Sequence, residues 1–313
     1  MERIVLYIFY FVVFPGLIFT AVMGLLAAWV DRKVTARVQY RVGPPWYQNF
    51  ADFFKLLGKE TVMPEGAKGS GFLILPLIGL VGITLVSTIV WVVNLNLASS
   101  FIGDVIVILY FLTLPSLAVI LGASASANPL GAVGSSREMK LILGYELPFV
   151  LAMIVPILKS GGMLKLGDLL AYQAANAPFL YSVSGSISFI IIIICMQAKL
   201  TFVPFDMPEA ETEIMSGAYI EYSGAPLAVL KLTKAMMLFT LPVFFITVFW
   251  SGMHFNSIAG AVYSILKYIV ILVLIILIKN TNPRLRIDQA VKLFWGRLTV
   301  WAIIALLFAI AGL

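Results

Sequence analysis

Long runs of apolar residues dominate this sequence and restrict it to a membrane fold. Of its 313 residues, 61% are hydrophobic and only 12% are charged, whereas soluble domains carry about 25% charged residues. The runs do not alternate between apolar and polar residues, so they predict helices and not the strands of a membrane barrel. We therefore predict an all-α integral membrane protein.

About eight of these runs are long enough to cross a bilayer as a helix, which takes about 20 residues. The first run lacks a small-residue cleavage site, so it is predicted to be a retained anchor and not a signal peptide. The helices are predicted to form one membrane domain over residues 1–313. The predicted spans are 4–30, 72–97, 103–122, 141–158, 179–198, 225–250, 257–279 and 297–313.

One segment between the first two spans has the pattern of an interfacial helix. Apolar residues recur at helical spacing over residues 46–58, with Asp52 and Lys55 among them. A helix with this pattern lies in the plane of the membrane interface. A plain interfacial anchor explains the pattern equally well, so the pattern alone assigns no function.

The distribution of positive charge predicts how the spans are oriented. Most of the 21 Lys and Arg residues lie in or beside loops 31–71, 123–140, 199–224 and 280–296. Positively charged loops stay on the cytoplasmic side, so these loops are predicted to be cytoplasmic and both termini to lie outside. We expect a multi-pass protein of the cytoplasmic membrane, surrounded by lipid. No run of basic residues indicates a nucleic-acid partner.

The chain has too few soft ligands for a metal centre. Its one cysteine is Cys195 and its one histidine is His254. An iron–sulfur cluster, a haem pair or a zinc site needs more ligands of this kind. Cys195 lies within an apolar run, which is typical of a packing residue. We therefore expect no metal or other cofactor in this chain.

Acidic residues are concentrated in residues 199–224, KLTFVPFDMPEAETEIMSGAYIEYSG, which we call the acidic stretch. Carboxylates beside hydrocarbon are costly unless they line a wet cavity, form ion pairs or move protons. If Pro208 opens a helix, Glu209 and Glu213 share one face of it. Such a cluster can store or pass protons, although a solvated loop is the plainer alternative. Its acidic residues are Asp206, Glu209, Glu211, Glu213 and Glu221.

Other ionisable residues fall in or near the predicted spans. Glu146 lies in the fourth span, and Glu138 precedes it by about two helical turns, so both can face one path if the helix extends that far. Lys231 and Lys234 lie in the sixth span and can share a face. Ionisable residues in a membrane usually mark an ion or proton path, although structural ion pairs are the alternative. Pairing of these lysines with Glu146 or the acidic stretch would offset the cost of burying them.

Three segments of the sequence resemble one family. DRKVTARVQYRVGPP follows the first span, PFDMPEAETEIMSGAYIEYSG follows the fifth, and NPRLRIDQAVKLFW follows the seventh. In this order, and over essentially the full chain, they resemble the H (ND1-type) subunit of respiratory complex I and its relatives in membrane-bound hydrogenases. The resemblance implies a non-catalytic subunit that joins a soluble redox arm to an ion-translocating arm through a chain of buried charges.

The resemblance also assigns residues to two groups. The implied ion path contains Glu138, Glu146 and the five acidic residues of the acidic stretch, and we add Lys231 and Lys234 from the sixth span. The second group forms a redox-arm interface or a former quinone cavity. It contains Arg32, Arg37, Asp52, Lys55, Arg284, Arg286 and Asp288.

Three departures from quinone-linked relatives favour the hydrogenase branch. Those relatives usually have Arg shortly before PFD, where this chain has Thr201, Phe202 and Val203. They also tend to have Glu near the position of Lys234, and their first loop is longer. The departures imply a hydrogenase-type complex in which electrons pass to a nickel–iron subunit. A quinone-reducing complex, with the quinone headgroup in a cavity walled by this chain, is the alternative.

The implied partners are soluble hydrogenase-like large and small subunits, an iron–sulfur subunit, antiporter-like subunits and small membrane subunits. The nickel–iron centre and the iron–sulfur clusters are expected in the soluble partners. A stand-alone secondary transporter is a second alternative, because it would also have about eight helices and buried charges. Such transporters usually contain an internal repeat, and the acidic stretch has no counterpart in the other half of the sequence.

Overall fold

The computed structural model describes residues 2–67 and 69–313 and confirms the predicted fold class. The elements in these residues are helices, and no strand occurs among them. Within residues 2–67 and 69–313, seven helical segments are long and apolar enough to cross a membrane. Where the fifth span is predicted, the chain forms a shorter apolar helix, α9 (Val183–Lys199). The protein is an all-α integral membrane protein.

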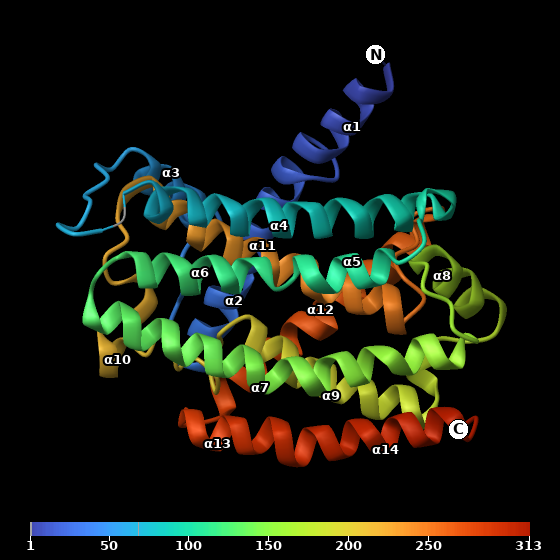
Figure 1. Ribbon diagram of the computed structural model, residues 1–313. Helices are drawn as coiled ribbons and strands as arrows, with labels where there is room; N and C mark the ends of the chain where they lie inside the picture. The colour runs from blue at the N-terminus through green and yellow to red at the C-terminus, as the bar shows by residue number, and fades with distance from the viewer. Residues whose placement is uncertain (1, 68) are drawn as a thin grey trace.

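The helices pack into a bundle (Figure 1). Helices α4, α6, α7 and α14 run nearly parallel, with α3 and α10 at one end and α8 and the C-terminus at the other. The remaining helices are α1 (Glu2–Val12), α2 (Leu17–Val38), α3 (Gln48–Leu57), α4 (Gly69–Leu95), α5 (Asp104–Phe111), α6 (Leu114–Ala125), α7 (Pro129–Lys159), α8 (Leu166–Ala175), α10 (Glu211–Ile214), α11 (Gly224–Phe249), α12 (Ile258–Thr281), α13 (Ile287–Lys292) and α14 (Thr299–Ile310).

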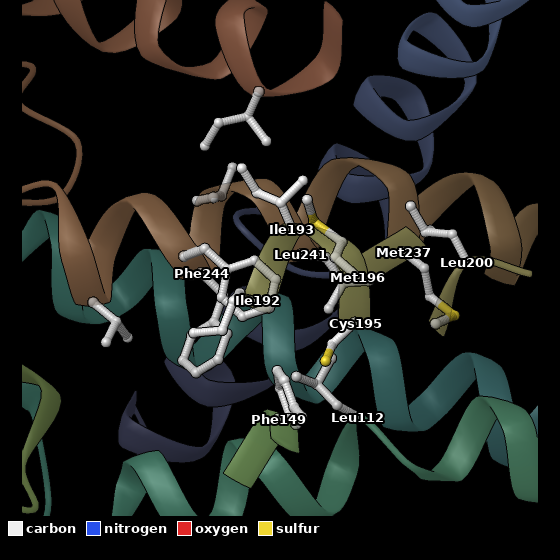
Figure 2. Packing of buried hydrophobic residues seen from close by; sticks show 14 of the residues in the cluster. Leu112, Phe149, Ile192, Ile193, Cys195, Met196, Leu200, Met237, Leu241 and Phe244 are labelled. Carbon is white, nitrogen blue, oxygen red and sulfur yellow. The ribbon is translucent and has the colours of Figure 1, made fainter. Parts of the chain in front are cut away.

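Helix α11 is the centre of the bundle. In the most apolar 18-residue stretch of this helix, 94% of the residues are buried. The helix packs against α2, α3, α4 and α12. A helix that is apolar on all sides is stable when other helices surround it. Figure 2 shows side chains of α9 and α11 lying together in this core, among them Ile192, Met196, Met237 and Leu241.

Helix α7 begins earlier than the sequence predicts, at Pro129 instead of residue 141. The side chain of Asn128 caps it by accepting a hydrogen bond from the Leu130 amide at 2.8 Å. Proline fits the first helical position because its missing amide has no helical partner there. The extension places Glu138 and Glu146 on one helix, which is the condition for both to face one path.

Two other helices also extend beyond their predicted ends. Helix α2 continues to Val38 instead of residue 30, so Arg32 and Arg37 lie on a helix and not in a loop. The last span begins with α13 at Ile287 instead of residue 297, and a π-helical turn joins α13 to α14. Hydropathy detects the part of a helix that lies in hydrocarbon, so it misses polar turns that project beyond it.

Two predicted spans are interrupted. The first is broken between α1 and α2, where Pro15 cannot donate a backbone hydrogen bond, and α1 diverges from the bundle in Figure 1. The third is broken between α5 and α6, just before Pro115. The apolar runs are continuous at both places, so proline is the sequence signal that marks the breaks.

Helix α8, which the sequence analysis does not predict, covers the end of the bundle opposite α3 (Figure 1). The buried carboxylate of Asp104 accepts hydrogen bonds from the Leu166 amide at 2.7 Å and the Ser100 hydroxyl at 2.6 Å. The Gln173 amide of α8 donates to the Thr247 carbonyl of α11 at 3.2 Å. These buried hydrogen bonds attach α8 to α5 and α11.

The predicted amphipathic segment forms α3, which packs against α2 and α11. The buried side chain of Asn49 accepts a hydrogen bond from Arg32 at 2.6 Å and donates one to the Leu25 carbonyl at 3.0 Å. Phe54 and Leu57 are 66% and 42% exposed. Polar contacts therefore attach α3 to the bundle while apolar side chains face outward, as expected for a helix at the membrane interface.

Helix α7 approaches the acidic stretch so closely at Gly134 that a side chain does not fit. A Cβ there would lie 2.4 Å from the Ala218 amide nitrogen and 3.0 Å from the Pro208 carbonyl oxygen. We expect Gly134→Ala to displace the acidic stretch and to lower the free energy of unfolding by about 1–3 kcal/mol. Thermal unfolding of the purified complex measures this loss.

The matched control for this prediction is Gly71→Ala on α4. A Cβ at Gly71 meets no atom within 4 Å, and alanine favours a helix over glycine, so this variant should unfold at or slightly above the wild-type temperature. If Gly134→Ala and Gly71→Ala unfold at the same temperature, α7 and the acidic stretch do not depend on this close approach.

Candidate functional site

The acidic stretch does not form a helix that opens at Pro208, so that prediction is wrong. Helix α10 begins at Glu211 and has four residues. The Asp206 carbonyl accepts the amides of Glu209 and Ala210, which closes a turn before the helix. Glu209 and Glu213 consequently separate, and their side chains are 26% and 58% exposed.

Lys199, the last residue of α9, is buried and forms an ion pair with Glu146 of α7. The distance from Nζ to Oε2 is 3.2 Å, and the Lys199 side chain is 0% exposed whereas that of Glu146 is 28% exposed. The same Nζ lies 4.9 Å and 4.8 Å from the ring centres of Tyr145 and Phe149. A buried ammonium group needs such a counter-charge and such aromatic faces because it has lost water.

Glu138 lies on α7 within reach of the same lysine. It is 2% exposed, and its Oε2 has no hydrogen-bond partner in the described part of the chain. A cavity of about 30 Å³ beside it is also lined by Lys199, Thr201 and Lys234. A cavity of this volume has room for water, and the Glu138 carboxylate and both lysines are polar groups on its otherwise largely apolar wall.

A second ion pair joins Lys234 of α11 to Glu209 of the acidic stretch. The Thr201 hydroxyl donates to the same carboxylate at 2.9 Å, and Lys234 Nζ lies 5.2 Å from the centre of the Phe202 ring. Lys231, three residues earlier, is exposed and has no ion pair among residues 2–67 and 69–313. Of the two lysines on α11, Lys234 is therefore the one that pairs with the acidic stretch.

A third ion pair joins Lys279 of α12 to Asp31 of α2 at 2.7 Å. Asp31 is 6% exposed, and Lys279 Nζ lies 4.6 Å from the centre of the Phe202 ring. Phe202 therefore contacts ammonium groups from two different ion pairs. The sequence gives little sign of this arrangement, because Asp31 and Lys279 fall at predicted span edges, where charged residues usually face water.

A fourth ion pair attaches the acidic stretch to the loop after α12. Asp206 lies 2.8 Å from Arg284, and the Leu285 amide donates to the Pro204 carbonyl at 3.1 Å. Burial raises the pKa of Asp206 above its ordinary value, although the guanidinium group of Arg284 opposes the shift. Asp206 therefore holds a proton more readily than a solvated aspartate does.

The other predicted path residues lie nearer the surface. Glu213 pairs with Arg137 of α7 at 2.8 Å, and Glu221 accepts a hydrogen bond from Asn128. Glu211 is exposed. The predicted ion path therefore contains the buried Glu138, a half-buried group of Glu146, Glu209 and Lys234, and a peripheral group.

Of the predicted redox-arm residues, Arg32 and Asp52 form an ion pair at 3.0 Å. Burial favours a higher pKa for Asp52, but hydrogen bonds from Gln48 and Arg32 outweigh it and hold the pKa below its ordinary value. Lys55 is exposed nearby on α3. The remaining members of this group are also exposed, namely Arg37, Arg286 and Asp288.

Two larger cavities lie beside these residues. One, of about 410 Å³, is lined by Glu209, Glu211 and Lys234, and the other, of about 460 Å³, lies between α2, α3 and α11. Within the described ranges, no group of three or more His, Cys, Asp and Glu residues is arranged to hold a metal ion. That cofactors belong to partner subunits stays a prediction.

Three of the pairs, those of Asp206, Glu209 and Glu146, each include a residue of the acidic stretch. Their carboxylate side chains are 13%, 26% and 28% exposed, so all three are partly shielded from water. Charges interact strongly where water is scarce, so a change of charge at one pair alters the energy of the next. A proton added to one carboxylate leaves its basic partner without a counter-charge. The arrangement can therefore pass a change of charge from one pair to another.

The described fold and site can be compared with known proteins. The family model described as NADH dehydrogenase matches residues 10–310. The chain belongs to this family, in its ND1 type. It is 32% identical over 287 residues to the H-type subunit of the NADH-quinone oxidoreductase of Anoxybacillus flavithermus, covering 87% of this chain and 83% of the relative.

Two further matches extend over most of the chain. The second H-type subunit of the NADH-quinone oxidoreductase of Syntrophobacter fumaroxidans is 31% identical over 305 residues, covering 91% of this chain and 90% of the relative. A chain of the membrane-bound sulfane sulfur reductase, an archaeal respiratory membrane complex, superposes with a TM-score of 0.84 and 27% identity. That match covers 94% of this chain and 96% of the other.

Family membership agrees with the resemblance of the three sequence segments. The chain is a multi-pass membrane subunit of a complex I-like family, and its relatives are subunits of respiratory complexes. These matches do not separate the hydrogenase-type version of this membrane protein from the quinone-linked one.

The contacts of the Phe202 ring with Lys234 and Lys279 can be tested by substitution. Each cation–π contact contributes roughly 0.5–2 kcal/mol, so Phe202→Leu should lower the free energy of unfolding by about 1–2 kcal/mol. Phe202→Tyr keeps an aromatic face and should retain most of this stability. Thermal unfolding of the two purified variants makes the comparison, and equal losses would show that the ring does not hold Lys234 and Lys279.

Proposed function

We propose that this chain is the membrane-anchoring and ion-coupling subunit of a hydrogenase-type respiratory complex. The observation that carries the proposal is the series of ion pairs that ends at Lys199 and Glu146, near the middle of α7. Redox chemistry in a soluble arm changes the protonation of the acidic stretch. The change of charge passes through Glu209 and Lys234 to Glu138 and Glu146, and from there to antiporter-like subunits.

The surroundings of Lys234 support an electron acceptor other than quinone. Lys234 stands near the position where quinone-linked relatives tend to have Glu, and it is already paired with Glu209. Thr201, Phe202 and Val203 stand where they usually have an Arg, and Phe202 contacts Lys234 and Lys279. The similar solved structure belongs to a sulfane sulfur reductase, so a sulfur compound is an alternative acceptor.

The proposed function includes an orientation of the bundle in the membrane. The end that carries α3 and α10 (Figure 1) faces the cytoplasm and the redox arm, because the loops there are rich in Lys and Arg. Both termini then lie outside. The exposed Arg37, Arg286 and Asp288 would contact the soluble large, small and iron–sulfur subunits, which would carry the nickel–iron centre and the clusters.

The equivalent ND1-type subunit of a quinone-reducing complex is the second candidate. The names of the curated relatives favour it, and so does the cavity of about 460 Å³ between α2, α3 and α11, which is within the usual volume of ligand sites. Four basic side chains line that cavity, however: Arg32, Lys55, Lys59 and Lys231. A neutral quinone headgroup would not balance their charge.

The proposal can be tested by purifying the whole complex through an affinity tag on this chain. The purified complex is assayed for hydrogen evolution from reduced ferredoxin, for quinone reduction and for sulfur reduction. Hydrogen evolution without quinone reduction is expected. Quinone reduction would replace the hydrogenase-type proposal with the second candidate, and purification of the tagged chain alone would favour a stand-alone transporter.

The role of Glu146 can be tested by Glu146→Gln. This change removes the counter-charge of the buried Lys199. We expect most ion transport by the reconstituted complex to be lost while electron transfer by the soluble arm stays largely intact. Ion uptake and substrate turnover are measured in the same vesicles.

The matched control is Glu65→Gln, because Glu65 is an exposed glutamate outside the ion pairs. It should leave both activities unchanged. Normal ion transport by Glu146→Gln would remove Glu146 from the path.

A further inference from the structure

The cavity between α2, α3 and α11 combines a basic rim with an apolar wall. Its volume is about 460 Å³. Four lining residues are basic and one, Asp52, is acidic, and most of the others are apolar. The apolar ones are Leu25, Ala28, Phe53, Leu56, Ala228, Leu232 and Ala235.

The basic rim carries positive charge that its neighbours do not neutralise. The Asp52 carboxylate already forms an ion pair with Arg32 at 3.0 Å. Lys55, Lys59 and Lys231 are exposed, and no ion pair involves them in the part of the chain that the structure describes. Three ammonium groups therefore surround one cavity, and such a group of lysines attracts the phosphate of an anionic lipid.

The apolar wall continues along the outer face of α2. Ile18, Val22, Leu25, Ala28 and Arg32 follow one another at spacings of three or four residues, so they form one stripe on this helix. Ile18 and Val22 are 53% and 42% exposed, and Leu25, Ala28 and Arg32 line the cavity. At a rise of 1.5 Å per residue, its apolar part from Ile18 to Ala28 is about 15 Å long, close to half of the roughly 30 Å hydrocarbon thickness that one leaflet fills.

The position of α3 adds a membrane interface to this arrangement. Its Phe54 is 66% exposed, and Trp46 just before it is 59% exposed. Exposed aromatic side chains of this kind lie at the level of lipid headgroups. The cavity beside α3 is therefore at the depth where a phospholipid has its phosphate, with the stripe on α2 leading into the hydrocarbon.

We propose that this cavity binds one anionic phospholipid. Its phosphate contacts Lys55, Lys59 and Lys231, and one acyl chain lies along the stripe on α2. The bound lipid touches three helices at once, so it holds α3 against the bundle. This inference rests on the proposed function, because a quinone-reducing complex would hold its quinone in the same cavity. None of the ion pairs with Glu146, Glu209 or Asp206 takes part in the site.

Native mass spectrometry of the delipidated complex tests the site. The complex is titrated with phosphatidylglycerol, which is anionic, and with phosphatidylcholine, which has no net charge. Wild type should bind one phosphatidylglycerol that phosphatidylcholine does not replace. Lys55→Gln/Lys231→Gln should bind it roughly 30-fold more weakly, because each basic residue contributes about fivefold.

The matched control is Lys140→Gln/Lys292→Gln, which removes the same charge at two exposed lysines outside the cavity. It should bind phosphatidylglycerol as wild type does. Lys55→Arg/Lys231→Arg keeps the charge of the rim and should also bind the lipid. Wild-type affinity in the glutamine pair, or equal binding of both lipids by wild type, would overturn the proposal.

A second measurement uses the unaltered complex, in case the glutamine variant does not assemble. A phosphatidylglycerol with a photoreactive acyl chain should attach to the stripe on α2 around Val22 and Leu25. No adduct on α2 would overturn the proposal. Displacement of the lipid by a quinone would overturn it too, and would assign the cavity to the quinone.

Discussion

The buried ammonium group of Lys199 is the constraint on which the site depends. A charge with no exposed surface at this depth needs a counter-charge, and Glu146 supplies it at 3.2 Å. Removing one member of such a pair typically costs about 3–5 kcal/mol. The rings of Tyr145 and Phe149 complete its surroundings. The end of α9 is therefore fixed against the middle of α7.

Two other ion pairs repeat this arrangement with less complete burial of the ammonium group, because the Lys234 and Lys279 side chains are each 25% exposed. The central helix α11 positions Lys234, and the acidic stretch brings Glu209 to it. Phe202 lies against this pair and against the Lys279 pair, so the neighbouring helices α11 and α12 share one aromatic contact. Protonation of one carboxylate would alter the balance of charge at its neighbours, and this coupling is the physical basis of the proposed function.

Much of the fold follows from the sequence, but contacts between distant residues do not. Hydropathy predicts the helices, and the depth of Glu146 and Lys234 marks them as functional candidates. Hydropathy misses α8 and the polar ends of α2, α7 and α13, because these segments are only partly apolar. Lys199 also escapes notice, because its partner Glu146 is 53 residues away and lysines at span ends usually reach the interface.

The backbone of the acidic stretch is the part that sequence patterns predict least well. A proline followed by two glutamates four residues apart is typical of a helix start. The chain instead forms a turn at Asp206 and only a short α10, since Glu209 is drawn to Lys234 and Glu213 to Arg137. Tertiary ion pairs outweigh the local helical preference there.

The most direct test of this account is the number of ions moved per electron by the Lys199→Gln complex in sealed vesicles. Lys140→Gln, which changes an exposed lysine on α7, is its control. The account predicts that Lys199→Gln still transfers electrons while this number falls toward zero, and that Lys140→Gln keeps the wild-type number. An unchanged number in Lys199→Gln would contradict the claim that the buried pair couples redox chemistry to ion movement.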